Sequence, residues 1–172
     1  GVEVLYEHGR MAWHFVHERL HEWPLTGGAS TLRRAAGPEP ELVEMTRRLL
    51  DHLQWHGVAM VEWRRDAGGV VHLMEINPRL WGSLPLTIAA GVPIPLGLLS
   101  LATGQALAPV RGWRVGVTAR NLSNDIQWFI DNLRADRRNP MLLTSSPWRA
   151  ALGWLRVLTG RDAIARHIEE RK

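Results

Sequence analysis

The alternation of apolar and polar positions predicts two β-hairpins in the first half of the chain. Residues 1–6 (GVEVLY) and 10–20 (RMAWHFVHERL) have the composition of strands, and residues 7–9 between them form a turn. Residues 58–64 and 70–76 flank the turn sequence RDAGG in the same way. We therefore expect four strands, paired as two antiparallel hairpins.

A helical period replaces this alternation at residues 40–56. Leu42, Leu49 and Leu53 recur at the spacing of one helix face, and Pro40 suits the first turn. The segment between the two hairpins is therefore predicted to contain a helix that packs on the sheet.

Shorter elements follow the second hairpin. Ser83 can cap a helix that ends near Gly91, and Pro95 can open another that ends at Gly104. The other expected elements are a loop at 22–31 (EWPLTGGAST), a linker at 105–112, a strand at 113–120, and helices at 124–136 and 147–158.

Together the predicted elements define an α+β fold. Residues 1–104 are expected to form an antiparallel sheet with helices packed on one face, and residues 105–172 a small mixed α/β extension of unknown role. The chain has 172 residues and 45% of them are hydrophobic, which is enough for a core. It has no cysteine, which excludes disulfides and thiol catalysis and is typical of a cytoplasmic protein.

Burial selects the pairing within the second hairpin. With a two-residue loop at 67–68, Glu62 lies opposite Leu73 and one diagonal from Glu75, and Asn77 shares their face. The opposite face is apolar and would lie against the helices. A shift of one residue would bury Glu62 among apolar side chains, which is costly for a charge.

Two carboxylates and an amide on one face form a partial shell for a hard divalent ion such as Mg²⁺ or Mn²⁺. Arg79, beyond the strand end, can bind a phosphate or carboxylate through its planar guanidinium. The same residues are also compatible with an ordinary solvated hairpin face, so spacing alone leaves both interpretations open.

The basic residues are almost all arginine: of 21, only Lys172 is lysine. They are scattered rather than clustered, which favours a solvated surface over a nucleic-acid interface. Nucleic-acid binding stays an alternative that would require steeply salt-dependent affinity.

Residues 80–110 carry no charge, but Pro85, Pro93, Pro95 and Pro109 divide them into short pieces. Two short buried helices are expected there rather than a membrane span. The chain begins with glycine and has no recognisable leader, and is expected to be part of a longer protein.

The stretch LMEINPRLWGS at 73–83, with Glu62 thirteen residues before Glu75, resembles the C-terminal signature of the ATP-grasp superfamily. About the first 105 residues take part in this resemblance. Within this superfamily, their motifs most resemble those of the ATP-grasp domains of carbamoyl-phosphate synthase large chains and biotin carboxylases.

The resemblance implies roles for individual residues. Glu62 and Glu75 would bind the Mg²⁺ (or Mn²⁺) ions that hold the ATP phosphates, with Asn77 as a third ligand. Arg79 would steady the transferred phosphoryl group, and Met74 would touch the adenine edge. The weaker candidates are Thr26, Gly27 and Gly28 near the triphosphate, and Arg19 and Ser83 for the substrate. Ordinary structural roles are the alternative for these five residues: a turn for Thr26–Gly28, an exposed strand position for Arg19 and a helix cap for Ser83.

The resemblance also implies a function. The chain would be the C-terminal fragment of an ATP-dependent carboxylate–amine (or related) ligase that binds Mg-ATP and forms an acyl phosphate. Its partners would be ATP, a small carboxylate and the missing N-terminal part of the polypeptide, with no nucleic acid or membrane and with homo-oligomerisation left open. The phosphate-binding lysines of the family are absent, so the isolated chain is expected to be inactive or weakly active. The alternative is a non-catalytic, ATP-grasp-like assembly or regulatory module.

Overall fold

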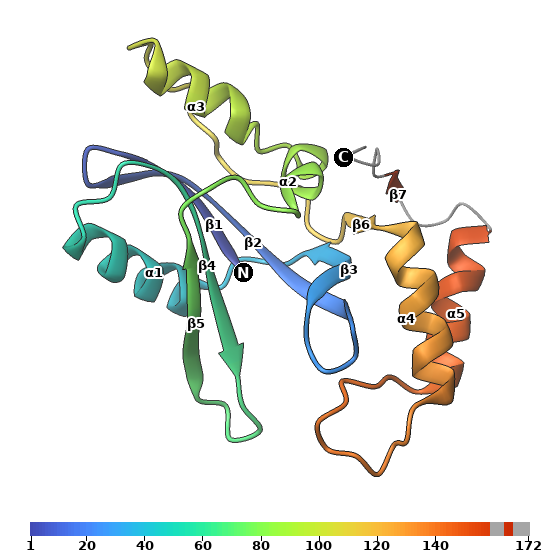
Figure 1. Ribbon diagram of the computed structural model, residues 1–172. Helices are drawn as coiled ribbons and strands as arrows, with labels where there is room; N and C mark the ends of the chain where they lie inside the picture. The colour runs from blue at the N-terminus through green and yellow to red at the C-terminus, as the bar shows by residue number, and fades with distance from the viewer. Residues whose placement is uncertain (159–163, 167–172) are drawn as a thin grey trace. The chain divides into compact units, whose positions relative to one another are not determined.

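The computed structural model describes residues 1–158 and 164–166 (Figure 1). The predicted α+β class is confirmed. The strands are β1 (Val2–Glu7), β2 (Arg10–Trp23), β3 (Ala29–Ala35), β4 (Gly57–Arg65), β5 (Val71–Asn77), β6 (Thr118–Arg120) and β7 (Ile164–Arg166). The helices are α1 (Pro40–His52), α2 (Leu84–Ala90), α3 (Ile94–Ala102), α4 (Leu122–Arg134) and α5 (Pro147–Leu158).

The chain divides into two compact units, and each unit is built from two separate segments. Unit 1 comprises residues 1–18 and 35–116, and unit 2 comprises residues 19–34 and 117–172. The strand order is β5-β4-β1-β2-β3-β6-β7, and β2 contributes residues to both units. The expected division of the chain into domains at residues 1–104 and 105–172 remains a prediction.

Both predicted hairpins are present in unit 1. β1 pairs antiparallel with β2 and with β4, and β4 pairs antiparallel with β5. Because β1 is central, its residues from Val2 to Tyr6 are buried on both faces of the sheet.

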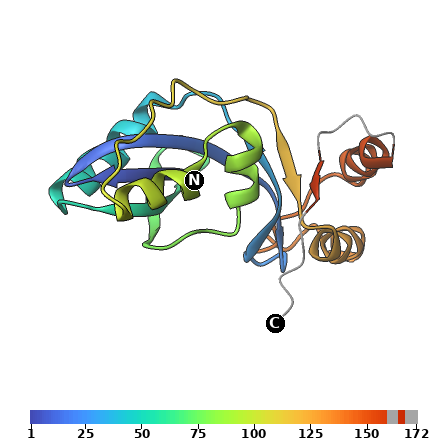
Figure 2. The ribbon, with the colours of Figure 1, turned by 90° about the horizontal axis from the view of Figure 1, so that it is seen from above.

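Helices lie against both faces of this sheet, rather than against one face as predicted (Figure 2). Val2, Val4 and Tyr6 point to one face, where they form an apolar core with Leu50 of α1. Glu3 and Leu5, at the alternating positions, point to the face that carries α2 and α3. The side chain of Glu3 bonds to residues at the start of α2.

The hairpin of β4 and β5 differs from the predicted pairing. The turn has three residues between Asp66 and Val70, with Gly69 at φ +86°, instead of the two residues expected. A β-bulge follows: Trp63 pairs with Leu73 and Glu62 with Glu75, which leaves Met74 as the extra residue. Each irregularity moves the pairing by one residue, so Glu62 faces Glu75 rather than Leu73.

Helix boundaries follow the local signals with two exceptions. The helix expected to reach residue 56 ends at His52, and Gln54 turns the chain at φ +49°. Ser83 stands at the N-cap position of α2 but makes no capping hydrogen bond. Gly91 ends α2 in the left-handed region at φ +104°, as its position predicted.

Unit 2 contains the end of β2, most of β3, β6, α4 and α5. β3 begins at Ala29, inside the segment that was expected to be a loop, and pairs antiparallel with β6. α4 packs beside α5 (Figure 1), and Leu25, Trp128 and Ala150 form the core. The predicted helices at 124–136 and 147–158 are thus present as α4 and α5.

Among the described residues, no single helix is long and apolar enough to cross a membrane. α2 and α3 would reach that length and composition only as a pair, and they are bent by 99° at the break between them.

Candidate functional site

Glu62 and Glu75 stand directly opposite each other on β4 and β5. Directly opposed residues have Cβ atoms only about 4.5–5.5 Å apart, so the two carboxylates project from neighbouring points of one face. Glu62 is half-buried and Glu75 is exposed. Their arrangement is closer than the diagonal one predicted, because the turn and the bulge at Met74 each add a residue on the β5 side.

Asn77 completes this cluster. It is buried at the end of β5, pairs with Met60 of β4, and its Nδ2 donates to Oε1 of Glu75 at 2.7 Å. Pro78 follows and has no amide hydrogen, which explains why the strand ends there. The amide oxygen is the remaining acceptor of the Asn77 side chain.

The donor set fits a hard divalent cation. Within residues 1–158 and 164–166, no group of three His, Cys, Asp or Glu side chains could hold a metal ion by itself. Two carboxylates and one amide oxygen nevertheless suit Mg²⁺, which is usually bound through one or two carboxylates while water and phosphate oxygens fill its other positions. A cation there would also offset the repulsion between two like charges at opposed positions.

Met74 directly precedes Glu75, and Arg79 follows Asn77 by two residues. Arg79 is exposed in the loop after β5, where its Nη1 donates to the carbonyl of Leu80 at 3.1 Å. Met74 is 54% exposed at the bulge. Both residues therefore present their side chains toward solvent, and their roles in binding nucleotide remain predictions.

Ser83 is turned inward. It is buried, and its hydroxyl donates to Oε1 of Glu3 at 2.5 Å. A direct substrate contact by Ser83 stays a prediction, while its observed partner is a residue that sequence reasoning did not single out.

The other sequence candidates belong to unit 2. Thr26 and Gly27 belong to a tight turn closed by the amide of Gly27, which donates to the carbonyl of Pro24 at 3.1 Å, and Gly28 follows this turn. Gly27 has φ +104°, a conformation that favours glycine. Arg19 lies on β2 with its guanidinium 4.0 Å from the carboxylate of Glu22.

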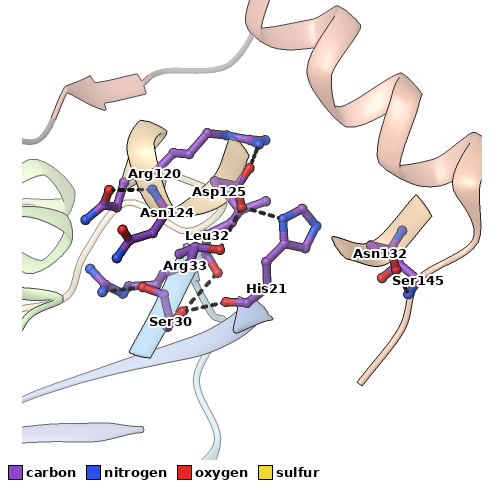
Figure 3. A network of polar contacts seen from close by, with 11 residues as sticks. His21, Ser30, Leu32, Arg33, Arg120, Asn124, Asp125, Asn132 and Ser145 are labelled. Atoms are coloured by element: carbon purple, nitrogen blue, oxygen red, sulfur yellow. Dashed lines mark hydrogen bonds and ion pairs between the residues drawn. The ribbon is translucent and has the colours of Figure 1, made fainter. Parts of the chain in front are cut away.

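Unit 2 also contains a buried polar network that sequence reasoning missed (Figure 3). Asp125 of α4 accepts hydrogen bonds from Thr31 (2.7 Å) and Arg120, and its Oδ1 lies 2.8 Å from Nδ1 of His21. The His21 ring stacks on Trp128, with ring centroids 3.3 Å apart. The residues come from β2, β3, β6 and α4, so no local motif could reveal the cluster.

A pocket of about 340 Å³ opens elsewhere in unit 1. It lies between residues 12–14 of β2 and residues 110–113, and Trp13 and Trp113 form part of its wall. None of the predicted site residues lines it.

The family comparison agrees with the α+β fold described above. Residues 2–124 match the family described as "ATP-grasp in the biosynthetic pathway with Ter operon", so the chain belongs to the ATP-grasp superfamily. A comparison with curated protein sequences finds no significant match.

Two solved structures share the fold. A biotin carboxylase–β,γ-ATP complex from Campylobacter jejuni is 14% identical with a TM-score of 0.54, over 68% of this chain and 27% of that one. The phosphoribosylaminoimidazole carboxylase ATPase subunit from Aquifex aeolicus is 21% identical with a TM-score of 0.52, over 68% of this chain and 37% of that one. The chain thus spans well under half the length of either structure.

Proposed function

We propose that this chain supplies the metal-binding and phosphate-positioning part of an ATP-dependent ligase active site. The observation that carries the proposal is the direct opposition of Glu62 and Glu75, with Asn77 bonded to Glu75. Membership of the ATP-grasp superfamily supports the proposal that the bound nucleotide is ATP.

In this proposal Glu62, Glu75 and Asn77 hold Mg²⁺ or Mn²⁺. When bound, the ion neutralises charge on the ATP phosphates. The two strands hold the carboxylates on a rigid sheet, and the bond from Asn77 orients Glu75. Arg79, on the exposed loop just beyond, binds an oxygen of the transferred phosphoryl group.

The reaction class is activation of a small carboxylate. A carboxylate oxygen of the substrate bonds to the γ-phosphorus as the bond from that phosphorus to the β,γ-bridging oxygen breaks, which gives an acyl phosphate and ADP. An amine or related nucleophile then attacks the acyl carbon, and inorganic phosphate leaves with the electron pair of the broken C–O bond. The chain's residues contribute charge and positioning rather than covalent chemistry.

Binding of Mn²⁺ tests the metal site directly. Electron paramagnetic resonance measures the free Mn²⁺ that remains when the chain is titrated with the metal, with and without ATP. We expect Glu62→Gln and Glu75→Gln each to weaken Mn²⁺ binding by more than about tenfold, because each removes a charged ligand. Glu41→Gln is the matched control, since Glu41 is an exposed carboxylate in the first turn of α1.

Equal Mn²⁺ affinity in the wild-type chain and in both variants would show that the opposed carboxylates are not the metal site.

A further inference from the structure

Glu3 is a fully buried carboxylate at the centre of the unit 1 sheet. Its Oε1 accepts a hydrogen bond from Ser83 (2.5 Å), and its Oε2 accepts one from Thr87. Nδ1 of His17, on β2, lies 3.0 Å from Oε1. One side chain on β1 is therefore hydrogen-bonded to both the beginning and the middle of α2.

A buried carboxylate is costly unless hydrogen bonds and charge compensate it. Two hydroxyl donors supply hydrogen bonds here, and the imidazole of His17 lies beside the same carboxylate. An apolar residue would fill the same space without needing such partners, so the core alone does not require Glu3. What the carboxylate adds is a fixed position for Ser83 and Thr87.

The position of Glu3 in the sheet connects it to the candidate metal site. Glu3 pairs with Met60 on β4, and Met60 pairs with Asn77 on β5. Paired residues share a face, and neighbouring strands are about 4.8 Å apart, so Glu3 lies two strands, or about 10 Å, from Asn77. The Ser83 hydroxyl also lies 4.0 Å from the sulfur of Met60 in the same row.

The loop that carries Arg79 is attached at several points. It leaves the sheet at Asn77 and reaches Ser83, which Glu3 holds. Between them, Trp81 is buried, and its Nε1 donates to Oγ1 of Thr87 at 3.4 Å. Thr87 in turn donates to Glu3, so two of the attachments depend on one carboxylate.

We propose that Glu3 is a positioning residue of the nucleotide site. By holding Ser83 and Thr87 it fixes the loop at 78–83 and keeps Arg79 beside the face that carries Glu75 and Asn77. The functional part of this inference rests on the role proposed above for Arg79, whereas the structural part does not.

Backbone dynamics of the loop provide the test, with a matched pair of variants at Thr87. Thr87→Val keeps the shape of the side chain and loses the hydroxyl, and Thr87→Ser keeps the hydroxyl. In ¹⁵N relaxation measurements on the full chain, we expect Thr87→Val and Glu3→Gln to lower the order parameters at 79–82 from about 0.85 to below about 0.6. Thr87→Ser should keep the wild-type values.

A second readout separates positioning from general stability. Amides of α1, on the opposite face of the sheet, should keep their order parameters in all three variants. The indole ¹H–¹⁵N resonance of Trp81 should shift in Glu3→Gln, because the indole donates to Thr87 and Thr87 donates to Glu3. Loosening of α1 together with the loop would overturn the proposal, and so would unchanged loop order in Thr87→Val and Glu3→Gln.

The functional part is measured as Mn²⁺ and ATP binding in Glu3→Gln. We expect Mn²⁺ affinity close to wild type, because Glu62 and Glu75 are intact, and ATP affinity weakened about tenfold or more through loss of Arg79 placement. Wild-type protein without Mn²⁺ binding would refute the proposed function, yet the loop measurements would still decide whether Glu3 fixes the loop. Unchanged ATP affinity in a variant with a disordered loop would refute the functional part alone.

Discussion

His21 and Asp125 lie 104 residues apart in the sequence, yet their Nδ1 and Oδ1 atoms are 2.8 Å apart in the interior of unit 2. Burial alone would raise the pKa of Asp125. The hydrogen bond to His21, the charge of Arg120 and the hydrogen bond from Thr31 outweigh that effect, so the pKa of Asp125 is lowered. The folded protein therefore favours the ionised carboxylate.

The stability of the chain should consequently fall in acid. A carboxyl group with a lowered pKa in the folded state stabilises that state above its unfolded pKa of about 3.9, and this contribution is lost as the pH falls through the folded value. We expect the free energy of unfolding in urea, followed by tryptophan fluorescence, to decrease below about pH 4.

Asp125→Asn should remove this part of the acid dependence. It should also destabilise the chain by about 3–5 kcal/mol near neutral pH, because it leaves the buried Arg120 without its counter-ion. Glu41→Gln is the control, since Glu41 is exposed on α1 and should change stability little. Equal losses in the two variants would contradict the role assigned to the buried network.

Tyr6 should resist ionisation in alkali. It is fully buried, and its hydroxyl donates to Oδ1 of Asp51 at 3.0 Å. Burial first, and then the hydrogen bond and negative charge of Asp51, raise the pKa of Tyr6 well above the usual value of about 10. The stabilisation is complete below about pH 10 and is lost as the pH rises above it.

Tyr6 is the only tyrosine of the chain, so ultraviolet absorbance of the phenolate reports this residue alone. We expect no phenolate signal at about pH 10 in the folded chain, and its appearance only when the chain unfolds. Free titration at the ordinary pKa with intact circular dichroism would show that Tyr6 is not held in this way.

Gly97 of α3 should tolerate no side chain. A Cβ at this position would contact the ring of Trp13 and lie 2.6 Å from Cδ2 of Leu5. Gly97→Ala should therefore cost about 1–3 kcal/mol through overpacking, less the roughly 0.5–1 kcal/mol that alanine contributes to a helix. Urea denaturation measures the difference.

Gly37→Ala is the matched control, because a Cβ at Gly37 would meet nothing within 4 Å. Its effect should be neutral or slightly stabilising. A Gly97→Ala chain as stable as Gly37→Ala would show that α3 does not pack closely on Trp13 and Leu5.

The extent to which sequence predicted this structure is clearest in the second hairpin. The alternation located both strands, and the burial argument correctly placed Glu62, Glu75 and Asn77 on one face. The turn length and the bulge at Met74 were not predicted, because each adds a single residue that leaves the local pattern almost unchanged. Beyond the bulge the two errors together shift the pairing by two residues, which keeps Glu75 and Asn77 on the face of Glu62. Between the turn and the bulge the shift is one residue, so Leu73 lies on the face of Trp63 instead.

Polar contacts between residues far apart in the chain could not be predicted from the sequence. Ser83 has the composition and position of a helix cap, and only the packing of α2 on β1 reveals that its hydroxyl bonds to Glu3. His21 and Asp125 are likewise unremarkable in their own segments. Such contacts depend on which elements meet in space, whereas propensity and periodicity describe each element by itself.

The crossing of β2 from one unit to the other has a practical consequence for dissecting this protein. Each unit is discontinuous, so no single cut of the backbone releases either one whole. Cleavage after Gly116 would leave His21 and Thr31 on the first product and Asp125 on the second. The carboxylate of Asp125 would then lose these two partners. Excision of residues 117–172 as an independent domain should therefore yield an unstable polypeptide.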